Sequence, residues 1–405
     1  MSSLEFGTPQ RARARNRRLV LDVVWHEGTV TRAELGSIIK LSKSAIKEIC
    51  EGLIEDGLLE EVQLDSAARK QGRPALSLRV AGLHGNLLGI DIGADKVVAR
   101  SATLAGETIA SREIRTRQDD PDHRDVLALV DRAVSAVHAA GGFHTVVVST
   151  PGIVDPTTQR VRLAPQIRGW DGIDVRAAVA ERVGVDLERV FVERQTDLSM
   201  LAESIDGAAR GARSVFYVQI GIGIGAGLLL DGRVYRGAEG AAGEVGYLAH
   251  DFGEVAPPDS GIGAWEWAAG GQAWARHGRA AALEPRGARL RELAGGDPDR
   301  VDAEIVVNAA REGDPAARAV FDRLTDRLAV GIASAVCVLN PDCVVVAGGL
   351  SQAGPILRDA LAERLRPLVP VVPDVRLAAY GGDGGVTGAV HRASKYAFDA
   401  LTPLP

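Results

Sequence analysis

The sequence predicts an α/β protein made of a small N-terminal helical unit and a larger body of two lobes. Three observations lead to this prediction. Helical periodicity with capping signals extends from residue 13 to Gly57, and a strand-rich segment with glycine turns occurs twice in the remainder, from residue 86 and from residue 215. The 47 glycines among 405 residues suit the tight turns of an alternating architecture, and a chain of this length exceeds one ordinary core.

The first helix is predicted over residues 13–26, where apolar side chains repeat at helical spacing before Gly28. Thr31 and Glu34 have the spacing of a capping box, which opens a short second helix that reaches residue 39. Ser42 then caps a third helix. The apolar side chains of this third helix form one stripe, which consists of Ile46, Ile49, Cys50, Leu53 and Ile54.

The N-terminal end of the third helix carries small polar and basic side chains on its outward side. These are Ser42, Lys43, Ser44 and Lys47. Two short helices joined by a tight turn, with such residues at the start of the second, have the geometry that presents side chains to base edges in the DNA major groove. We therefore predict that these residues bind DNA, together with Thr31 and Arg32 at the start of the preceding helix.

A hairpin follows, with strands predicted over residues 58–64 and 76–80 and a polar tip between them. The tip is basic and contains Arg69, Lys70, Gln71 and Arg73. A β-ribbon of this kind can reach the DNA backbone or the minor groove, where cations displace counterions. Residues 1–82 are thus predicted to form a winged helix-turn-helix that binds double-stranded DNA. A dimerisation or protein-binding module is the alternative.

Composition and charge are compatible with this prediction. The net charge of −6 is uneven, because residues 1–80 hold 13 Lys+Arg against 11 Asp+Glu, or +2, which leaves −8 for the remainder. Three scattered cysteines predict no disulfide framework and a reducing compartment. No apolar run has the length of a membrane span or the features of a signal peptide. We therefore expect a cytoplasmic protein without a membrane partner.

The body begins with three strands separated by turns, predicted between residues 86 and 114. A helix over residues 123–140, a strand, a second helix and the short strand VFVE follow. The next unit starts in the same way, with a glycine-rich strand pair that opens at residue 215. Helices are predicted in this unit over residues 264–281, 315–339 and 355–368, and a final helix from Thr387. Two such units predict two lobes that face each other across a cleft.

Together these residues resemble the ROK family, whose members are sugar-responsive repressors and sugar kinases of the actin-like, or ribonuclease H-like, ATPase fold. The resemblance covers nearly the whole chain and is carried by TRAELGSIIKLSKSAIKEICEGLIEDGLLEE, Gly72-Arg73-Pro74, Asp91-Ile92-Gly93-Ala94-Asp95-Lys96, STPGIVD, the run from Ala164 to Trp170, GIGAGLLLDG, GAEGAAGEVG and LNPDCVVVAGGL. It implies one lobe over residues 83–204, completed by a C-terminal helix over 387–400, and a second lobe over 205–386. Family kinases begin near Leu87 without a winged helix, so the resemblance implies a regulator.

The chain departs from the family's kinases at the catalytic position. Those kinases carry an Asn-Asp pair after the strand VFVE, and the aspartate deprotonates the sugar hydroxyl. Arg194 and Gln195 stand at these positions. A glutamine amide cannot accept a proton, and loss of a general base costs about 10²–10⁴-fold in rate. Asp197, two residues later on a helix, is expected to be rotated by about 200° and to point off the cleft. We therefore expect that the protein is not an enzyme.

Three further family signatures are altered. Asp95 and Ile222 replace the threonines of the two glycine loops, and an acidic side chain there would repel phosphate. Tyr247 replaces the histidine of the family's ExGH motif. The cysteine positions of the family's zinc element are occupied by Pro257, Asp259 and Ala264. Because structural zinc needs four nitrogen or sulfur ligands, we expect no metal and no cofactor.

The resemblance also implies an effector site in the cleft, formed by Gly152, Arg194, Gln195, Glu244, Tyr247 and Glu266. Arg194 has two possible roles there. Its guanidinium could clamp an anionic effector, such as a sugar acid or a phosphosugar, bidentately. It could instead pair with Glu244 or Glu193 and close the pocket. Both roles stay open at this point, as does a neutral sugar bound by the glutamates, and our hypothesis is that an effector, if there is one, is anionic.

The predicted function is sequence-specific DNA binding by a transcription regulator, expected to be a repressor with an inactive, kinase-like effector domain. We expect a homodimer, or a dimer of dimers, on a two-fold-related operator. Closure of the lobes on an effector would change the spacing of the two DNA-binding units. A ligand-insensitive DNA-binding regulator and an active sugar kinase are the alternatives, and Arg194 and Gln195 argue against the kinase.

Overall fold

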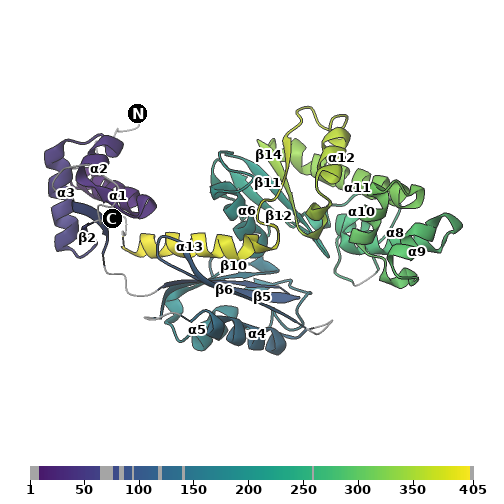
Figure 1. The fold of residues 1–405 in the computed structure, drawn as a ribbon, viewed down its shortest axis with the longest axis horizontal. Coiled ribbons are helices and arrows are strands. Elements are labelled where there is room, and N and C mark those ends of the chain that lie inside the picture. The colour runs from purple at the N-terminus through teal and green to yellow at the C-terminus, as the bar shows by residue number, and fades with distance from the viewer. Residues whose placement is uncertain are drawn as a thin grey trace.

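The computed structural model describes residues 9–63, 76–81, 86–93, 95–116, 121–138, 142–257 and 260–401. A small helical unit, the head (the described part of residues 9–81), lies at one end of a body that contains two sheets with helices around them (Figure 1). Some of the predicted site residues lie outside the described residues. These are the DNA-binding residues Arg69, Lys70, Gln71 and Arg73, with the motif Gly72-Arg73-Pro74, and Asp259 at one of the altered zinc positions.

The head consists of α1 (Pro9–Glu27), β1 (Val30–Thr31), α2 (Arg32–Ile39), α3 (Lys43–Glu55), β2 (Leu59–Gln63) and β3 (Leu76–Val80). Its strands pair antiparallel in the order β1-β3-β2. The capping box of α2 is present, since the Glu34 N–H donates to Thr31 Oγ1 at 3.3 Å and the Thr31 N–H donates to Glu34 Oε2 at 2.9 Å. α1 begins four residues earlier than residue 13, because proline is favourable in the first turn of a helix.

Lobe 1 is a five-stranded sheet with helices on both faces. Its strands are β4 (Asn86–Ile92), β5 (Lys96–Ala102), β6 (Thr108–Arg115), β7 (Phe143–Thr150) and β10 (Val190–Arg194), in the order β10-β7-β4-β5-β6. The helices α4 (His123–Ala136) and α5 (Val175–Val183) cover one face. The helices α6 (Gln195–Ile205) and α13 (Gly384–Leu401) cover the other (Figure 1). A small hairpin, β8 (Ile153–Val154) with β9 (Val161–Arg162), and the short helix η1 (Leu187–Arg189) complete the lobe.

Lobe 2 contains β11 (Val215–Ile220), β12 (Ile224–Leu230), β13 (Arg233–Val234), β14 (Cys343–Ala347) and β15 (Asp374–Leu377), in the order β13-β12-β11-β14-β15. Its α-helices are α7 (Ala264–Ala269), α8 (Gly271–Leu283), α9 (Ala288–Leu293), α10 (Ala303–Arg311), α11 (Pro315–Leu339) and α12 (Pro355–Leu365). Short 3-10 helices lie at Val245–Tyr247, Pro285–Gly287, Pro298–Arg300, Gly349–Ala353 and Gly381–Asp383. The large side chains of Trp265, Trp274 and Phe321 are buried in its core.

The two sheets of the two units that the repeated sequence pattern predicts share one topology. In each, the first strand is central, pairs antiparallel with the second on one side and parallel with the fourth on the other. The third strand lies at one edge, antiparallel to the second, and the fifth lies at the opposite edge, parallel to the fourth.

Several predicted helix boundaries are wrong. α4 ends at Ala136 rather than at residue 140, and α12 ends at Leu365 rather than at residue 368. The helix predicted over residues 264–281 is divided into α7 and α8 at Gly270, whose backbone is extended with φ −65° and ψ 171°. The final helix begins at Gly384 rather than Thr387. Its glycine-rich start does not resemble a helix in sequence, but a side chain is excluded there because a Cβ on Gly385 would lie 2.3 Å from Asp91 Oδ1.

α13 approaches α6 so closely that residue 388 has to be glycine. A Cβ at Gly388 would lie 1.9 Å from the carbonyl oxygen of Leu198 in α6. We expect Gly388→Ala to lower the free energy of unfolding by about 1–3 kcal/mol, because the overlap outweighs the gain in helix propensity of about 1 kcal/mol. Urea unfolding of the full chain measures this loss. Gly349→Ala is the control, since nothing lies within 4 Å of a Cβ there, and an equal loss in both variants would refute the steric argument.

No helix among the described residues combines the length and apolar character needed to cross a membrane.

Candidate functional site

A cluster of charged side chains joins the two lobes where β10 ends and α6 begins. Arg194 is the last residue of β10 and is 4% exposed. Its Nη2 donates to Asp197 Oδ1 at 2.7 Å and to the carbonyl oxygen of Ala226 at 3.1 Å, and its Nη1 donates to Glu244 Oε1 at 3.2 Å. Asp197 belongs to α6 of lobe 1, whereas Ala226 and Glu244 belong to lobe 2. The guanidinium is thus held within the protein by two carboxylates.

Glu193, the neighbour of Arg194 on β10, has different partners. Arg236, from the segment after β13, contacts Glu193 Oε2 and lies 3.6 Å from Asp197 Oδ2. Arg392 Nε and the Tyr396 hydroxyl, both from α13, donate to Glu193 Oε1 at 2.8 and 2.6 Å. Burial alone would raise the pKa of Glu193, but the charges of Arg392 and Arg236 and the Tyr396 hydrogen bond outweigh it and lower the pKa.

We call these groups the interlobe cluster: Glu193, Arg194, Asp197, Arg236, Glu244 and Arg392. It contains three carboxylates and three guanidiniums, so its charges balance without a ligand. The sequence leaves two roles open for Arg194, a clamp for an anionic effector and an internal ion pair, and the structure contains the internal ion pair. Its partners are Glu244 and Asp197, while Glu193 is bound by other cations.

Asp197 faces no open site, and burial with ion pairing accounts for this rather than a side chain turned outward by helix rotation. Its side chain is 2% exposed and lies against the guanidinium of Arg194, whose length lets it reach back over the first turn of α6. Burial raises the pKa of Asp197 more than Arg194 and Arg236 lower it. Since Oδ1 contacts Arg194 and Oδ2 faces Arg236, neither oxygen is directed at an open site.

Gln195 lies on the other side of α6, away from the interlobe cluster. Its Nε2 donates to Asp91 Oδ1 at 3.0 Å, and its Oε1 lies 3.5 Å from Gln219 Nε2 on β11 of lobe 2. Asp91 also accepts a hydrogen bond from Ser149. Burial raises the pKa of Asp91, although the hydrogen bonds from Ser149 and Gln195 act in the opposite direction. Gln195 therefore links Asp91, which belongs to the first glycine-loop motif, to Gln219 of lobe 2.

Glu244, Tyr247 and Glu266 come together at the start of α7. The Ile224 N–H donates to Glu266 Oε2 at 2.9 Å. Burial and the charge of Glu244 raise the pKa of Glu266 against that hydrogen bond, and burial with both carboxylates raises the pKa of Tyr247. The Tyr247 hydroxyl donates to the Gly261 carbonyl at 2.6 Å. Among the predicted effector residues, Arg194 and these three thus form one neighbourhood.

Gly152 is packed elsewhere. It lies between β7 and β8 with φ +89°, and a Cβ there would be 2.7 Å from the Arg162 carbonyl oxygen and 2.9 Å from Ala164 Cβ. The altered glycine-loop residue Ile222 is 64% exposed between Gly221 and Gly223. A Cβ at Gly223 would lie 2.5 Å from Glu266 Oε2, which shows how closely this loop approaches the predicted effector residues.

An ionic cluster occupies the segment that contains two of the altered zinc positions. Glu254 is bound by Arg276 at 2.8 Å, His277 at 2.9 Å and Arg327 at 2.8 Å. The guanidinium of Arg276 also lies 3.9 Å from the centre of the Trp267 ring. Burial would raise the pKa of Glu254, but hydrogen bonds from both arginines lower it.

A hollow of about 600 Å³ beside this segment includes Pro257 and Ala264, two of the altered zinc positions, in its lining. No group of three metal-binding side chains is present in the described parts of the chain.

The predicted DNA-binding residues of the head fall into two groups. Thr31 Oγ1 donates to Glu34 Oε2 at 2.8 Å, and Arg32 forms an ion pair with Glu61 at 2.6 Å, so both side chains already have partners in the head. The other group is exposed at the start of α3. Ser42 caps this helix by accepting from the Ala45 N–H at 3.2 Å. Its remaining members, all exposed, are Lys43, Ser44 and Lys47.

The turn between α2 and α3 has a strained residue at its centre. Lys40 adopts the left-handed conformation with φ +59°, which favours glycine. The side chain of Lys40 is exposed, like that of Lys43. The turn therefore places two lysines at the exposed start of α3.

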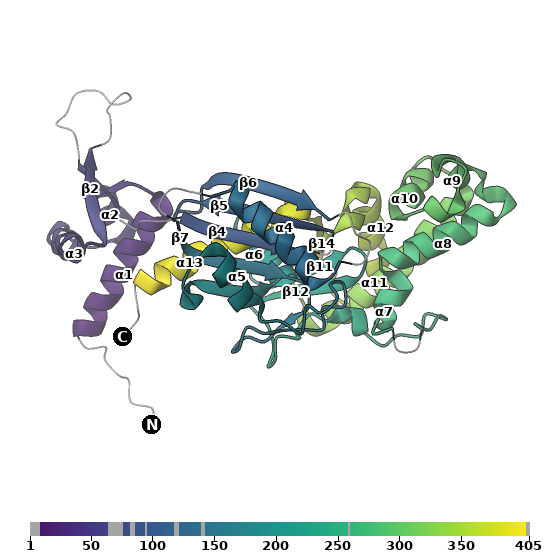
Figure 2. The same cartoon turned by 90° about the horizontal axis from the view of Figure 1, so that it is seen from below.

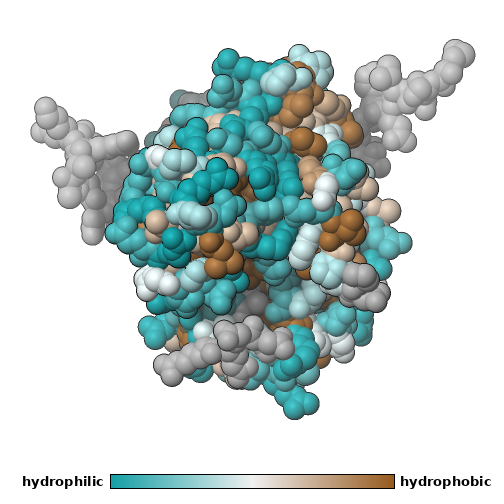
Figure 3. All heavy atoms as spheres, turned by 90° about the vertical axis from the view of Figure 1, so that its right-hand side faces the viewer, coloured by the Kyte–Doolittle hydropathy of each residue, from teal (hydrophilic) through white to brown (hydrophobic). Residues whose placement is uncertain are grey.

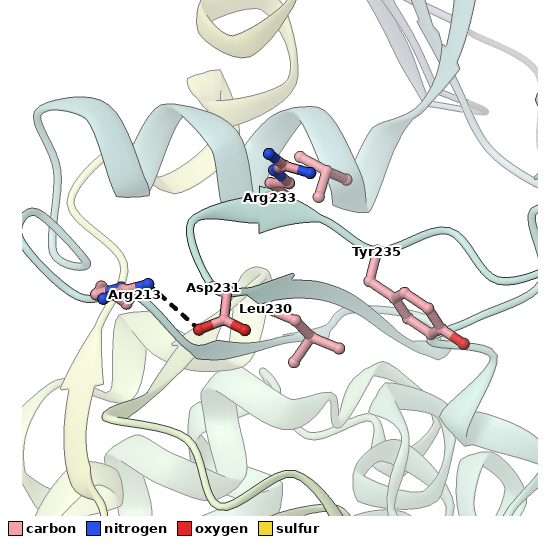
Figure 4. A pocket seen from close by; sticks show the side chains of 6 residues that line it. Arg213, Leu230, Asp231, Arg233 and Tyr235 are labelled. Atoms are coloured by element: carbon pink, nitrogen blue, oxygen red, sulfur yellow. Dashed lines mark hydrogen bonds and ion pairs between the residues drawn. The ribbon is translucent and has the colours of Figure 1, made fainter. Parts of the chain in front are cut away.

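A surface hollow of about 660 Å³ lies beside the β12–β13 turn, away from all the predicted site residues (Figure 4). Arg213 and Asp231 form an ion pair across it at 3.4 Å, and both side chains are more than three-quarters exposed. Such a pair contributes little to stability or to ligand binding. The opposite end of the molecule from the head is mostly hydrophilic, with apolar side chains in separate patches (Figure 3). Neither surface adds a second candidate site.

Reasoning from the sequence missed Arg236, Arg392 and Tyr396. They lie 43, 199 and 203 residues from Glu193 along the chain. An arginine after a short strand and an Arg-x-x-x-Tyr pair on the last helix carry no signal of their own. Only the folded arrangement shows that they neutralise a buried carboxylate.

Comparison with known proteins gives consistent matches. A model of the ROK family matches residues 87–395. A putative xylose repressor from Caldicellulosiruptor sp. (strain Rt8B.4) is 26% identical over 358 residues, which cover 87% of each chain. A solved ROK family transcriptional regulator, a homologue of the E. coli MLC protein, is similar in fold with a TM-score of 0.71 at 24% identity over 97% of this chain and 98% of that one. A ROK family glucokinase from Streptomyces griseus, in complex with glucose and AMPPNP, has a TM-score of 0.66 at 26% identity and covers 77% of this chain and 100% of its own.

Proposed function

The chain belongs to the ROK family, and from this premise we propose that it is a DNA-binding transcription regulator whose kinase-like body does not transfer phosphate. The body has the mixed α/β, actin-like fold of this family, which kinases and regulators share. The function therefore depends on the individual residues of each site rather than on the fold.

The observation that carries the proposal is the position of Arg194. It stands where the resemblance places the asparagine of the kinases, and Gln195 stands where it places the base. The guanidinium of Arg194 is bound to Asp197 and Glu244, so a carboxylate that could act as a base is already neutralised by an ion pair. Without a group that accepts the proton of a sugar hydroxyl, phosphate transfer loses its general base catalysis.

For the head we propose a winged helix-turn-helix. α2 and α3 are joined by a tight turn, and β2 and β3 form an antiparallel ribbon beside them. The exposed start of α3, with Lys43 and Ser44, would enter the major groove, while the ribbon would follow the backbone. A homodimer would present two such heads to the halves of a two-fold-related operator. The similarity to a putative xylose repressor over 87% of both chains supports this assignment.

The ion pairs of Arg194 also change the hypothesis on the effector. The hypothesis of an anionic effector depended on a guanidinium free to bind it, whereas two carboxylates already neutralise this one. Glu244 and Glu266 remain as hydrogen-bond acceptors, and the side chain of Glu244 is 33% exposed. We propose that an effector of this site is a neutral, hydroxyl-rich molecule such as a sugar, because carboxylates accept hydrogen bonds from hydroxyl groups and repel anions.

Titration calorimetry with D-xylose, D-glucose, D-gluconate and D-glucose 6-phosphate tests the effector, and we expect binding of a neutral sugar only. Selection of bound fragments from genomic DNA, repeated with each compound, tests DNA binding and its regulation. Incubation with ATP and glucose should give no sugar phosphate above the uncatalysed background. Binding of D-gluconate alone, or of D-glucose 6-phosphate alone, would refute the proposal of a neutral effector. Sustained phosphate transfer to glucose would refute the proposed loss of catalysis. If the protein selects no DNA fragments, the proposal of a DNA-binding regulator is refuted.

A further inference from the structure

We propose that α13 couples the interlobe cluster to the head, so that a change between the lobes alters how firmly the head is docked. The inference rests on the proposed DNA-binding function of the head, which it supplies with a route of regulation. α13 is part of lobe 1, yet its last two turns also contact α1 of the head (Figure 2).

The contact between the head and α13 is specific. Trp25 of α1 is 8% exposed, and its ring packs edge-on against Phe398 with the ring centres 5.1 Å apart. Its indole Nε1 donates to Ser394 Oγ at 2.9 Å, and the Ser394 hydroxyl donates to the Leu104 carbonyl at 2.8 Å. Arg18 of α1 forms an ion pair with Asp399. The head is therefore seated on α13 by packing and by directional bonds.

Glu193 of the interlobe cluster is bound by two residues from the same C-terminal part of α13. Arg392 and Tyr396 donate to Glu193, and the Tyr396 ring stacks on Phe191 at 4.1 Å. Arg392 precedes the head-contacting residue Ser394 by two positions, and Tyr396 precedes Phe398 by two positions. Two positions correspond to about 200° around a helix. Ser394 and Phe398 therefore face away from Arg392 and Tyr396, whereas Asp399 lies on nearly the same face as Arg392, so one short stretch of α13 contacts both Glu193 and the head.

The cluster depends on lobe 2 for part of its charge. Arg236 comes from lobe 2 and neutralises Glu193, whose side chain is 6% exposed. If the lobes separate and Arg236 withdraws, Glu193 keeps only Arg392 and Tyr396 as partners, and a buried carboxylate with less compensation is costly. Both remaining partners lie on α13. Loss of Arg236 would therefore change the contacts of α13, the helix against which the head packs. Helix shifts of about 1–2 Å at an interface are sufficient to switch a protein between two conformations.

Hydrogen exchange of the full-length protein, followed by mass spectrometry, tests the coupling without DNA or effector. In Glu193→Gln we expect exchange to rise about tenfold or more both in residues 235–247 of lobe 2 and in α1 of the head, since a charged partner has been lost from a buried cluster. Phe398→Ala should raise exchange in α1 and leave the exchange of residues 235–247 unchanged. This result would establish that the contact with α13 protects α1 from exchange.

Glu254→Gln is the matched control, because Glu254 is also held by two arginines, Arg276 and Arg327, and both of them belong to lobe 2. It should raise exchange locally and leave α1 as in the wild type. If Glu193→Gln unfolds lobe 1, Tyr396→Phe replaces it, since this variant removes one hydrogen bond to Glu193 and keeps the ring. A severalfold rise in α1 is then expected.

Faster exchange in residues 235–247 with wild-type exchange in α1 would overturn the coupling, whichever of the two variants is used. A rise in α1 for Glu254→Gln as large as for Glu193→Gln would overturn it as well. Failure of the proposed function is separate, because it would appear as an absence of DNA binding by the wild type while the exchange result still decides the coupling.

Discussion

Replacing Lys43 and Ser44 together with alanine is expected to lower the affinity for a selected operator about a hundredfold. Both residues are exposed at the start of α3, and a lost base contact costs about 1–3 kcal/mol. Ser42 is left in place because it caps the helix, so the fold of the head is maintained. Fluorescence anisotropy with the operator and with an unrelated duplex measures the loss, and binding to the unrelated duplex should change much less.

Arg213→Ala is the control for this pair, because it removes one positive charge from the exposed hollow in lobe 2, away from the head. We expect no change in operator affinity for this variant. If the α3 variant weakened both duplexes equally, the two residues would be phosphate contacts and α3 would not be the helix that reads the sequence.

Arg194→Met is expected to lower the free energy of unfolding of the body by about 3–5 kcal/mol, because it leaves Asp197 buried with a poorly compensated charge. The loss should depend on pH. Burial already raises the pKa of Asp197, and removal of Arg194 raises it further. A carboxyl whose pKa is higher in the folded protein than in the unfolded chain adds stability as the pH falls. The difference between wild type and variant should therefore be largest near pH 8 and shrink toward pH 5.

Urea unfolding at both pH values measures this difference. Adding Asp197→Asn to Arg194→Met should restore at least half of the lost stability, since it removes the uncompensated carboxylate. Arg213→Met, the same substitution in an exposed pair with Asp231, should change stability by less than about 0.5 kcal/mol. Equal losses at pH 8 and pH 5, with no recovery in the double variant, would show that Arg194 contributes by packing rather than by charge.

Local elements could be predicted from the sequence because their signals are local. The capping box of Thr31 and Glu34 and the cap at Ser42 form as the spacing predicts, and β3 has the predicted bounds. The repeated strand pattern also predicts two similar strand-rich units, since strand periodicity and glycine turns are properties of short segments, but the strand order that the two sheets share is found only in the structure.

The partners in the candidate site could be predicted only in part. Glu244 is one of the two partners that the sequence predicts for Arg194, whereas the ion pair between Arg194 and Asp197 is not predicted, because helix rotation alone does not account for the reach of an arginine. The partners of Glu193 come from segments 43 and 199 residues away. Charge compensation between such segments is decided by tertiary packing, for which a single sequence holds no signal.

The seat of the head on α13 has a consequence for how the protein is made. Trp25 and Ser394 are separated by 369 residues, so the head leaves the ribosome well before the part of α13 against which it packs. At a synthesis rate of about 5–20 residues per second, the head waits roughly 20–70 seconds before α13 exists. Each newly made chain therefore passes through a period in which the head is complete but undocked. A chain terminated before α13 would keep its head in that state permanently and would lack the helix that closes lobe 1.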